Sequence, residues 1–264
     1  MEIVEGNFIN QDLVSSALKD IRYVLHQGAI PSVPRSVADP VKSNEANVTG
    51  MLHLLEGARE VGVERFVYAA SSSAYGDTEV LPKVEDMPAN PLSPYAVGKY
   101  TGELYARVYA NIYRLPTVSL RYFNIFGPYQ DPASEYAAVI PKFILTMLRG
   151  EAPVIYGDGE QSRDFTYIDN VVEANLLACR SKKAGRGEVL NVACGERFTL
   201  NALVHALNEI LGTSIKPAYS EARAGDVKHS LADISKADEL LGYRVTVDFK
   251  EGLKRTVEWF RKRC

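Results

Sequence analysis

The sequence has too few cysteines to build a disulfide framework or a metal site. Only three occur in 264 residues, and Cys179, Cys194 and Cys264 lie too far apart for metal-ligand spacing. Such sparse use of cysteine is typical of a reducing, cytoplasmic setting. No apolar run is long enough to span a bilayer, and Met1 is followed at once by Glu2 rather than by a signal peptide. We therefore expect a cytoplasmic protein without a metal centre or a membrane span.

The chain also lacks a strong charge of either sign. Its 30 lysines and arginines are balanced by 33 aspartates and glutamates, which gives a net charge of −3. This balance offers no electrostatic reason to expect binding to nucleic acid or to a membrane surface. A hydrophobic content of 46% is enough for a buried core. The composition therefore predicts an ordinary globular protein with no nucleic-acid or membrane partner.

Strands and helices are predicted to alternate along the first half of the chain. Apolar runs predict strands at 2–8, 22–26, 65–70 and 117–121, and periodic patterns predict helices at 11–18, 44–61 and 94–113. Alternation at this pace is typical of an α/β fold with a doubly wound parallel sheet. Ligands bind such sheets beyond the carboxyl ends of the strands, and Gln27, Ser71 and Asn124 follow strands at that edge.

The second half alternates less regularly and predicts a smaller α/β lobe. Helices are expected at 136–148, 169–180, 199–211, 234–241 and 249–263, and strands at 153–156 and 189–192. We therefore divide the chain into a first domain, residues 1–135, and a second lobe, mainly residues 136–264, with some exchange of chain between them.

A serine run and a tyrosine–lysine pair form the candidate catalytic centre. Ser71–Ser73 ends the apolar stretch 65–70, while Tyr95 and Lys99 lie four residues apart just after Pro94, on one face of a helix. A free tyrosine has a pKa of about 10 and is a poor base, but an ammonium group one turn away lowers that pKa. A serine hydroxyl can then bond the substrate oxygen whose proton moves. The alternative is a packed aromatic residue beside a solvated lysine.

Several motifs in a fixed order carry a resemblance to a known family. They are Ser71-Ser72-Ser73-Ala74-Tyr75-Gly76, Tyr95-x-x-x-Lys99, Arg121-Tyr122-Phe123-Asn124 and Ser162-Arg163-Asp164-Phe165. Over essentially the whole chain they resemble the extended short-chain dehydrogenase/reductase family, and within it the NAD-dependent nucleotide-sugar 4-epimerases. Four further motifs resemble the members that act on UDP-N-acetylglucosamine: His26-Gln27-x-Ala29, Pro34-Arg35-Ser36, Gln130-Asp131-Pro132 and Gly225-Asp226-Val227.

The resemblance implies a role for each matching residue. Tyr95 is the general base and acid, Lys99 tunes it and holds the nicotinamide ribose, and Ser71 bonds the sugar O4. The C4 hydride passes to NAD, and the resulting 4-keto sugar turns over and is reduced on its other face. Residues 1–135 then form a partial NAD-binding domain. The cofactor contacts implied are Asn7, Phe8, Gln27, Gly28, Ala29, Asn47, Tyr95, Lys99, Tyr122 and Phe123.

The implied substrate contacts lie mostly in the second lobe. They are Ser71, Ser72, Ser73, Asn124, Val139, Tyr156, Arg163, Arg223, Asp226 and Ser230. A guanidinium group binds phosphate oxygens bidentately, so Arg163 and Arg223 suit a pyrophosphate; the alternative for each is a surface ion pair. The small Ser230 resembles the position that limits the C2 substituent of the sugar. This favours UDP-N-acetylglucosamine and UDP-N-acetylgalactosamine, without excluding UDP-glucose and UDP-galactose.

Two other functions stay open beside epimerisation. Related dehydratases carry an Asp-Glu pair after the position of Ser71, because loss of water needs an acid and a base. Ser72 and Ser73 stand there instead, which disfavours a dehydratase or decarboxylase. A sugar-nucleotide-binding protein without catalysis is the other alternative. The resemblance also implies a homodimer formed through helices 44–61 and 94–113.

One family feature is missing from the sequence. Members of the family open with a strand, a glycine-rich turn and a helix whose N-terminus binds the pyrophosphate of NAD. No two glycines here are three residues apart, and Glu5-Gly6-Asn7 resembles the third strand of the family. We therefore expect about 60 residues, two strand–helix units, to be lacking, and the sheet to expose an apolar edge. The chain is then a shortened form of an epimerase, a chain completed from elsewhere, or a non-catalytic relative.

Overall fold

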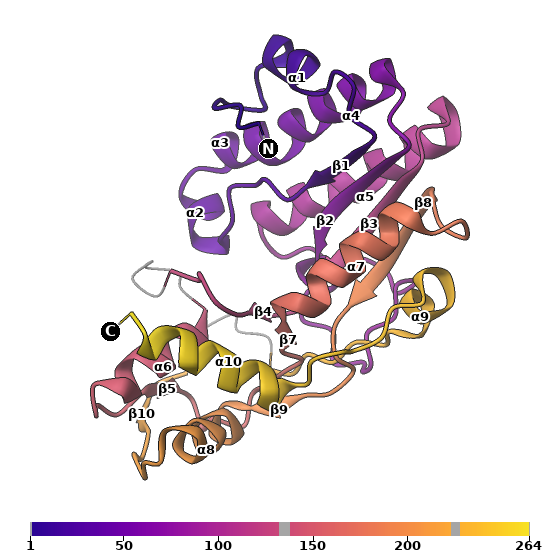
Figure 1. Cartoon of the computed structure of the whole chain (residues 1–264). Coiled ribbons are helices and arrows are strands. Elements are labelled where there is room, and N and C mark those ends of the chain that lie inside the picture. The colour runs from indigo at the N-terminus through magenta and orange to yellow at the C-terminus, as the bar shows by residue number, and fades with distance from the viewer. Residues whose placement is uncertain (1, 132–137, 223–227, 264) are drawn as a thin grey trace.

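A four-stranded parallel sheet organises the first lobe of the protein (Figure 1). The computed structural model describes residues 2–131, 138–222 and 228–263. In the order β1-β2-β3-β8, the sheet contains β1 (Tyr23–His26), β2 (Arg65–Ser71), β3 (Thr117–Tyr122) and β8 (Arg186–Val192), each parallel to its neighbours. The predicted α/β fold with a parallel sheet is therefore confirmed.

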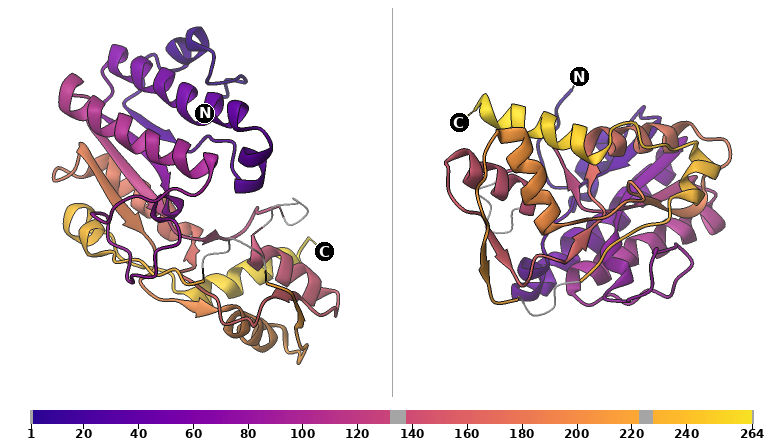
Figure 2. Two further views of the ribbon diagram at one scale, coloured as in Figure 1. Left: turned by 180° about the vertical axis from the view of Figure 1, so that it is seen from behind. Right: turned by 90° about the horizontal axis from the view of Figure 1, so that it is seen from below.

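Both faces of this sheet are covered by helices. Side chains alternate along β2, so Phe66 and Tyr68 join one buried cluster and Val67 joins another. The first cluster lies under α1 (Gln11–Ala17), α4 (Gly50–Val61) and α5 (Pro94–Tyr113). The second lies under α7 (Ile168–Arg180) and α9 (Ser235–Leu241), on the opposite face (Figures 1 and 2). Because both faces are buried, the central strands are continuous apolar runs rather than alternating ones.

The predicted helix 44–61 is interrupted in the structure. Two short helices, α2 (Val33–Ala38) and α3 (Pro40–Asn44), come first and are separated by the non-helical Asp39. From α3 the chain continues through the π-helical turn η1 (Glu45–Thr49) into α4. The π turn contains Asn47, whose side chain bonds both backbone groups of Ile30, at 2.8 and 3.1 Å. Widened turns of this kind are frequent at functional sites. Here the turn ties the helix to the loop that follows β1.

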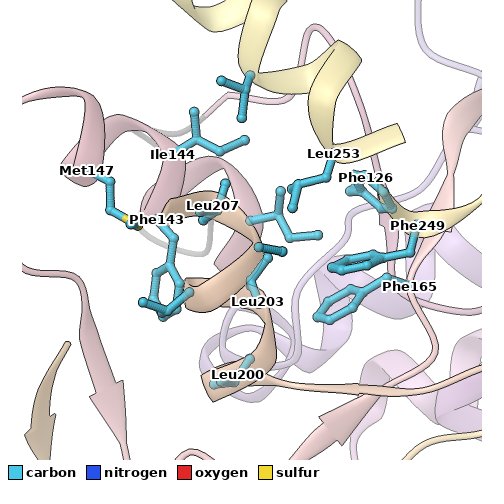
Figure 3. Close-up of a cluster of buried hydrophobic side chains, with 14 of the residues drawn as sticks. Phe126, Phe143, Ile144, Met147, Phe165, Leu200, Leu203, Leu207, Phe249 and Leu253 are labelled. Carbon is cyan, nitrogen blue, oxygen red and sulfur yellow. The ribbon is translucent and has the colours of Figure 1, made fainter. Parts of the chain in front are cut away.

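The second lobe has a separate apolar core between three helices. Buried side chains of α6 (Val139–Leu148), α8 (Leu200–Leu211) and α10 (Phe249–Arg261) meet aromatic residues from the strand ends (Figure 3). Phe165 stacks on Phe249 with ring centroids 5.6 Å apart. Short strands border this core: β4 (Ile125–Phe126), β5 (Val154–Tyr156), β6 (Ser162–Arg163), β7 (Thr166–Tyr167), β9 (Phe198–Thr199) and β10 (Ala218–Ser220).

One predicted element is not formed in the structure, and another lies partly outside the described residues. The strand predicted at 2–8 is wrong: residues 2–10 form coil and turns, and they pair with no strand in the described part of the chain. The helix predicted at 136–148 is described from Val139 onward, and its first residues lie outside the described part. The domain boundary near residue 135 also lies outside it and stays a prediction. Since β8 returns to the main sheet, chain does pass between the two lobes.

The edge of the sheet at β1 is open, as expected from the sequence. Tyr23 and Leu25 are 38% and 43% exposed, whereas Val24 and His26, which alternate with them along the strand, are buried. Within the described residues, no helix is both long and apolar enough to cross a bilayer. The same part of the chain holds no cluster of three His, Cys, Asp or Glu side chains arranged to bind a metal ion.

Candidate active site

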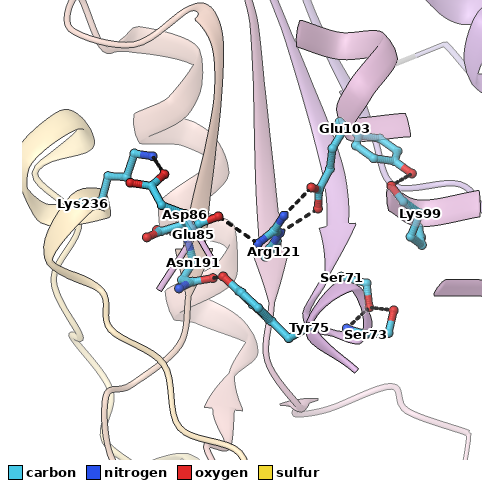
Figure 4. Close-up of polar contacts among 11 residues, drawn as sticks. Ser71, Ser73, Tyr75, Glu85, Asp86, Lys99, Glu103, Arg121, Asn191 and Lys236 are labelled. Carbon is cyan, nitrogen blue, oxygen red and sulfur yellow. Dashed lines mark hydrogen bonds and ion pairs between the residues drawn. The ribbon is translucent and has the colours of Figure 1, made fainter. Parts of the chain in front are cut away.

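The serine run lies at the carboxyl end of β2, where the chain turns away from the sheet. Ser71 is the last residue of the strand and caps the 3-10 turn η2 (Ser72–Tyr75). Its hydroxyl oxygen accepts hydrogen bonds from the backbone N–H of Ser73 at 3.2 Å and from the Ser73 hydroxyl at 2.8 Å (Figure 4). These bonds hold the Ser71 side chain at the strand end rather than leaving it free to rotate.

Tyr95 and Lys99 lie in the first turns of α5, which begins where the sequence predicts. The hydroxyl of Ser93 caps the helix by accepting the N–H of Ala96 at 3.2 Å, and Pro94 occupies its first position. The N–H of Tyr95 donates to the hydroxyl of Ser36 at 3.0 Å. The start of α5 is therefore tied to α2 as well as to its own cap.

Lys99 is buried rather than solvated. Its side chain is only 4% exposed. Its Nζ donates to the carbonyl of Ala69 in β2 at 2.7 Å and lies 5.0 Å from the ring centroid of Tyr68. The ammonium group thus reaches across to the strand that carries Ser71. This placement contradicts the alternative that Lys99 is a solvated neighbour on the helix.

Burial changes the pKa values of both residues. It lowers the pKa of Lys99 to about 8, an effect that the nearby Glu103 carboxylate partly offsets. Burial also raises the pKa of Tyr95 above its ordinary value, and the Ser71 hydroxyl acts in the opposite direction. The expectation that Lys99 lowers the pKa of Tyr95 is therefore wrong for this structure: desolvation of the phenol dominates, and the ammonium group points toward Ala69.

Replacement of Lys99 by methionine is expected to stabilise the fold at neutral pH. Burial of the charged ammonium, which lowers its pKa from 10.5 to about 8, destabilises the fold by about 3 kcal/mol, and methionine removes this cost. The variant also loses the hydrogen bond to Ala69, which destabilises it by about 1 kcal/mol. Below pH 8 folded and unfolded chains both carry the proton, so the full cost applies. Between pH 8 and 10.5 the folded chain loses its proton first, and the cost disappears. Lys99→Met should therefore gain about 2 kcal/mol at pH 7 and lose about 1 kcal/mol near pH 10.5, where only the loss of the bond to Ala69 remains.

Denaturant unfolding of both proteins across this pH range measures the effect. The exposed Lys42 of α3 supplies a control, because Lys42→Met should change the free energy of unfolding by less than about 0.5 kcal/mol at any pH. A gap between wild type and Lys99→Met that does not shrink as the pH rises would show that burial of the ammonium is not its cause.

Two predicted cofactor residues meet at the carboxyl edge of the sheet. The hydroxyl of Tyr122 donates to the side-chain oxygen of Gln27 at 3.2 Å, and the amide of Asn175 donates to that hydroxyl at 2.8 Å. Gln27 in turn donates to Asn175 at 3.0 Å. Asn175 of α7 was missed by the sequence analysis. The sequence offered one signal for it: Asn175 is a polar residue on the apolar face of the helix predicted at 169–180.

The other predicted cofactor residues are largely engaged within the protein. Phe8 packs edge-on against His26, with ring centroids 5.3 Å apart, and a Cβ added at Gly28 would lie 2.8 Å from the Phe8 ring. The Asn7 side chain accepts the N–H of Ile9 at 3.1 Å. Phe123 is fully buried beside Tyr75 and Ala193. Ala29 lies in the loop that follows β1, next to the segment held by Asn47.

A second group of predicted residues surrounds a cavity in the other lobe. The cavity has a volume of about 300 Å³ and is lined by Asn124, Val139, Tyr156 and Arg163, together with apolar residues such as Phe143 and Phe165. Asn124 has a positive φ of 36° and donates its side-chain amide to the carbonyl of Asp164 at 3.0 Å. An apolar pocket with a few convergent polar groups is the usual form of a small-molecule site.

The segment carrying Ser230 is bonded to β6 beside this cavity. The backbone N–H of Ser162 donates to the carbonyl of Lys228, and that of Ser230 donates to the carbonyl of Ser162, both at 3.0 Å. Ser230 itself is 9% exposed. Ser72 and Ser73 are half-buried near the other half of the site. Arg223 and Asp226, which were predicted to contact the substrate, lie outside the described residues.

Asp164 is a central polar residue that the sequence analysis placed only in a motif. It is fully buried, and its two carboxylate oxygens accept backbone N–H groups of Cys194, Gly195 and Ala232 at 2.8 to 3.2 Å. Burial raises the pKa of Asp164 to about 6, while these backbone hydrogen bonds act in the opposite direction. Asp164 therefore joins β6, β8 and the Ser230 segment between the two halves of the site.

Comparison with known proteins identifies the family. The model of the NAD dependent epimerase/dehydratase family matches residues 1–193. This chain belongs to that family. It is 38% identical over 264 residues to a putative UDP-glucose 4-epimerase of Methanocaldococcus jannaschii, covering 97% of this chain and 85% of that protein. The family prediction is thus confirmed.

Solved structures of other proteins agree with this membership. A UDP-N-acetylglucosamine 4-epimerase from Methanobrevibacter ruminantium, in complex with UDP-N-acetylmuramic acid, has a TM-score of 0.92 and 41% identity, with 99% of this chain and 83% of that one covered. A UDP-glucuronic acid 4-epimerase from Bacillus cereus, with UDP-glucuronic acid and NAD, has a TM-score of 0.90 and 34% identity, covering 99% and 82%. The comparisons support an NAD-dependent epimerase.

The residues of this epimerase-family chain fit one end of NAD. Four polar groups lie near one edge of the sheet: the ammonium of Lys99, the phenols of Tyr95 and Tyr122, and the amide of Gln27, which is bonded to Tyr122. This set of hydrogen-bonding groups suits a nicotinamide and its ribose. The glycine-rich turn that would hold the pyrophosphate is not among the 264 residues. The fit therefore covers the reactive end of the cofactor and leaves its phosphate anchor unassigned.

Proposed function

We propose that this chain catalyses the 4-epimerisation of a UDP-sugar. The observation that carries the proposal is that the buried Lys99 bonds the carbonyl of Ala69, two residues before Ser71 ends β2. Tyr95 lies one turn earlier on α5 and interacts with the Ser71 hydroxyl. Asn124 follows the neighbouring strand β3 and lines the cavity of the second lobe. A sugar at the strand ends can thus lie against the catalytic trio while its nucleotide enters the cavity.

Each member of the trio has a distinct role in this proposal. Tyr95 takes the proton from the sugar 4-hydroxyl and later returns it. Ser71 bonds the same oxygen, and its own position is held by Ser73. Lys99 supplies a positive charge beside the strand, with one N–H bonded to Ala69. When bound, NAD would supply the hydride acceptor and donor for C4.

The second lobe is proposed to hold the uridine diphosphate. Its cavity combines aromatic and aliphatic walls with Asn124, Tyr156 and Arg163. Such a mixture suits a flat base and a charged diphosphate, since a guanidinium group binds phosphate oxygens bidentately. Arg223 and Asp226 are assigned to the same ligand by the family motif alone. Ser72 and Ser73 are proposed to contact the sugar from the strand end.

The small Ser230 supports an N-acetylated sugar as substrate. Its segment is bonded to Ser162 of β6, and the neighbouring Arg163 lines the cavity. A short side chain there leaves room for a bulky C2 substituent. We therefore propose UDP-N-acetylglucosamine and UDP-N-acetylgalactosamine as the substrate pair, with UDP-glucose and UDP-galactose as the second candidates. Cytoplasmic location, and the division near residue 135 into a cofactor domain and a substrate lobe, remain part of this proposal.

Product analysis tests the proposed function directly. The protein is incubated with NAD and UDP-N-acetylglucosamine, and the nucleotide sugars are separated by chromatography. Formation of UDP-N-acetylgalactosamine supports the proposal, and turnover of UDP-glucose alone would correct the substrate. A dehydrated or decarboxylated product would favour the second function. NAD absent from the purified protein, with nucleotide-sugar binding but no turnover, would favour a binding protein.

A homodimer is proposed through the exposed faces of α4 and α5. Val97, Leu104, Val108 and Ile112 form an apolar stripe along α5, and each is 42 to 67% exposed. A stripe this exposed is unusual on a helix that faces only water. The two helices pack side by side, so a second copy can cover both (Figure 2).

A charge placed in this stripe is expected to separate the dimer. Leu104→Glu would bury an unpaired carboxylate between the two copies, which costs several kcal/mol. We expect wild type to sediment as a dimer and Leu104→Glu as a monomer. Val80→Glu provides the control, because Val80 is 60% exposed on the loop before α5 and is not one of the stripe residues. A wild-type protein that is monomeric throughout would contradict the proposed interface.

A further inference from the structure

A buried ion pair joins the catalytic helix to the sheet. Arg121 of β3 and Glu103 of α5 are 3% and 2% exposed. The arginine donates from Nε and Nη2 to the two carboxylate oxygens of Glu103, at 2.9 and 2.7 Å (Figure 4). A buried pair of charges is a weak source of stability, because desolvation offsets much of the attraction. Its presence beside the site therefore calls for a different explanation.

Arg121 contacts more than its carboxylate partner. Its guanidinium lies 4.5 Å from the ring centroid of Tyr75, and its Nη1 donates to the backbone carbonyl of Glu85 at 3.4 Å. Both neighbours are held by Asn191 of β8: the Tyr75 hydroxyl donates to the Asn191 side chain at 2.7 Å, and the Asn191 N–H donates to the Glu85 carboxylate at 2.7 Å. The contacts form one connected network (Figure 4).

The network reaches every segment that carries the catalytic trio. Tyr75 ends the 3-10 turn that Ser71 caps. Glu85 lies in the loop that leads from this turn to α5. Glu103 follows Lys99 by one helical turn and Tyr95 by about two. One guanidinium group thus contacts the segment before the loop, the loop itself and the helix after it.

We propose that Arg121 is a positioning residue, which fixes the catalytic helix against the serine turn and so sets the separation of Tyr95 from Ser71. This inference rests on the proposed epimerase function. The rigid fork of the guanidinium matters, because it binds Glu103 at two points while its face lies on Tyr75. A lysine could keep the charge but not these three contacts together.

A second buried arginine in the same sheet provides a matched control. Arg65 begins the neighbouring strand β2 at the opposite end of the sheet and is 9% exposed. It donates to the carbonyls of Ala184 and Ser181 at 2.7 and 2.9 Å. These bonds lead to the segment between α7 and β8, away from the serine turn and the start of α5. Arg65→Lys therefore perturbs a buried arginine without touching the network.

The experiment compares Arg121→Lys with Arg65→Lys in the full chain. For Arg121→Lys we expect kcat for the nucleotide sugar to fall about 10²-fold with little change in KM, since a small misplacement of reacting groups has effects of this size. Arg65→Lys should keep kcat near the wild-type value even if its melting temperature falls. An equal loss of kcat in both variants would overturn the proposal.

Hydrogen exchange supplies a readout that does not depend on turnover. Amides of the loop 76–93 and of the first turn of α5 should exchange faster in Arg121→Lys and at the wild-type rate in Arg65→Lys. Unchanged exchange in Arg121→Lys would overturn the positioning role. If wild type turns over no UDP-sugar, the proposed function fails while this measurement still decides the role of Arg121.

A double variant separates positioning from stability. Arg121→Met with Glu103→Leu removes both charges, a change that often leaves stability intact. A folded double variant with kcat lowered as in Arg121→Lys supports the proposal. A folded double variant with wild-type kcat would show that the polar fork is not needed, and would overturn it. If the double variant does not fold, the Arg121→Lys and Arg65→Lys comparison decides.

Discussion

Replacement of Tyr95 by phenylalanine is expected to lower kcat about 10³-fold while leaving the fold unchanged. General acid–base catalysis by a positioned side chain contributes on the order of 10² to 10⁴ in rate. Tyr95 is the candidate for that role, since it lies on α5 and interacts with the Ser71 hydroxyl, which partly offsets the rise of the Tyr95 pKa on burial. The substitution removes one hydroxyl and keeps the ring, so packing around the first turn of α5 should persist.

Steady-state turnover of the nucleotide sugar measures this effect. Tyr105→Phe is the control, because Tyr105 lies on the same helix and packs against the core of the first lobe. It should retain wild-type kcat. Melting temperatures of both variants should stay close to that of wild type. A Tyr95→Phe variant that keeps more than about a tenth of the wild-type kcat would remove Tyr95 from the proposed chemistry.

Replacement of Gly187 by alanine is expected to destabilise the fold by about 3 to 4 kcal/mol. Gly187 has a φ of +84°, and a Cβ there would lie 2.6 Å from the Cα of Arg107 on α5. The positive φ costs about 1 to 2 kcal/mol for an alanine, and overpacking adds about 1 to 3 kcal/mol. Gly187 also coincides with the irregular register between β3 and β8, and both of its neighbours, Arg186 and Glu188, are paired with β3.

Gly62 supplies the matched control for this substitution. Its φ of +70° is close to that of Gly187, but a Cβ added there would meet nothing within 4 Å. Gly62→Ala should therefore lower the free energy of unfolding only by the cost of a positive φ for alanine, about 1 to 2 kcal/mol. Denaturant unfolding of both variants isolates the contribution of the close approach between β8 and α5. Equal losses for the two glycines would contradict that explanation.

Much of the fold was predictable because local signals agree with one another. The apolar run at β2 and the Ser93–Pro94 start of α5 are local features, and the structure places both elements where the sequence predicts them. The strand predicted at 2–8 failed for the opposite reason. Its pattern suits a strand, but strand formation requires backbone pairing with a neighbouring strand, and residues 2–10 pair with none in the described part of the chain.

The candidate site was predictable only in part. Motif residues such as Tyr95 and Asn124 could be named from their spacing, because the family keeps them at fixed places along the chain. Spacing could not assign roles to Asn175, to Asp164 or to Glu103, the partner of Arg121. Their partners lie 18 to 148 residues away along the chain, and only the packing of helices on the sheet brings them together.

The amino-acid sequence by itself determined the alternation of strands and helices, the family and the identity of the candidate catalytic trio, since each depends on local periodicity or spacing. The tertiary structure decided which charges are buried and what they contact. It placed the Lys99 ammonium on the carbonyl of Ala69, and raised the pKa of Tyr95 instead of lowering it. Desolvation and hydrogen-bond geometry depend on every neighbouring element, so these properties exist only in the folded chain.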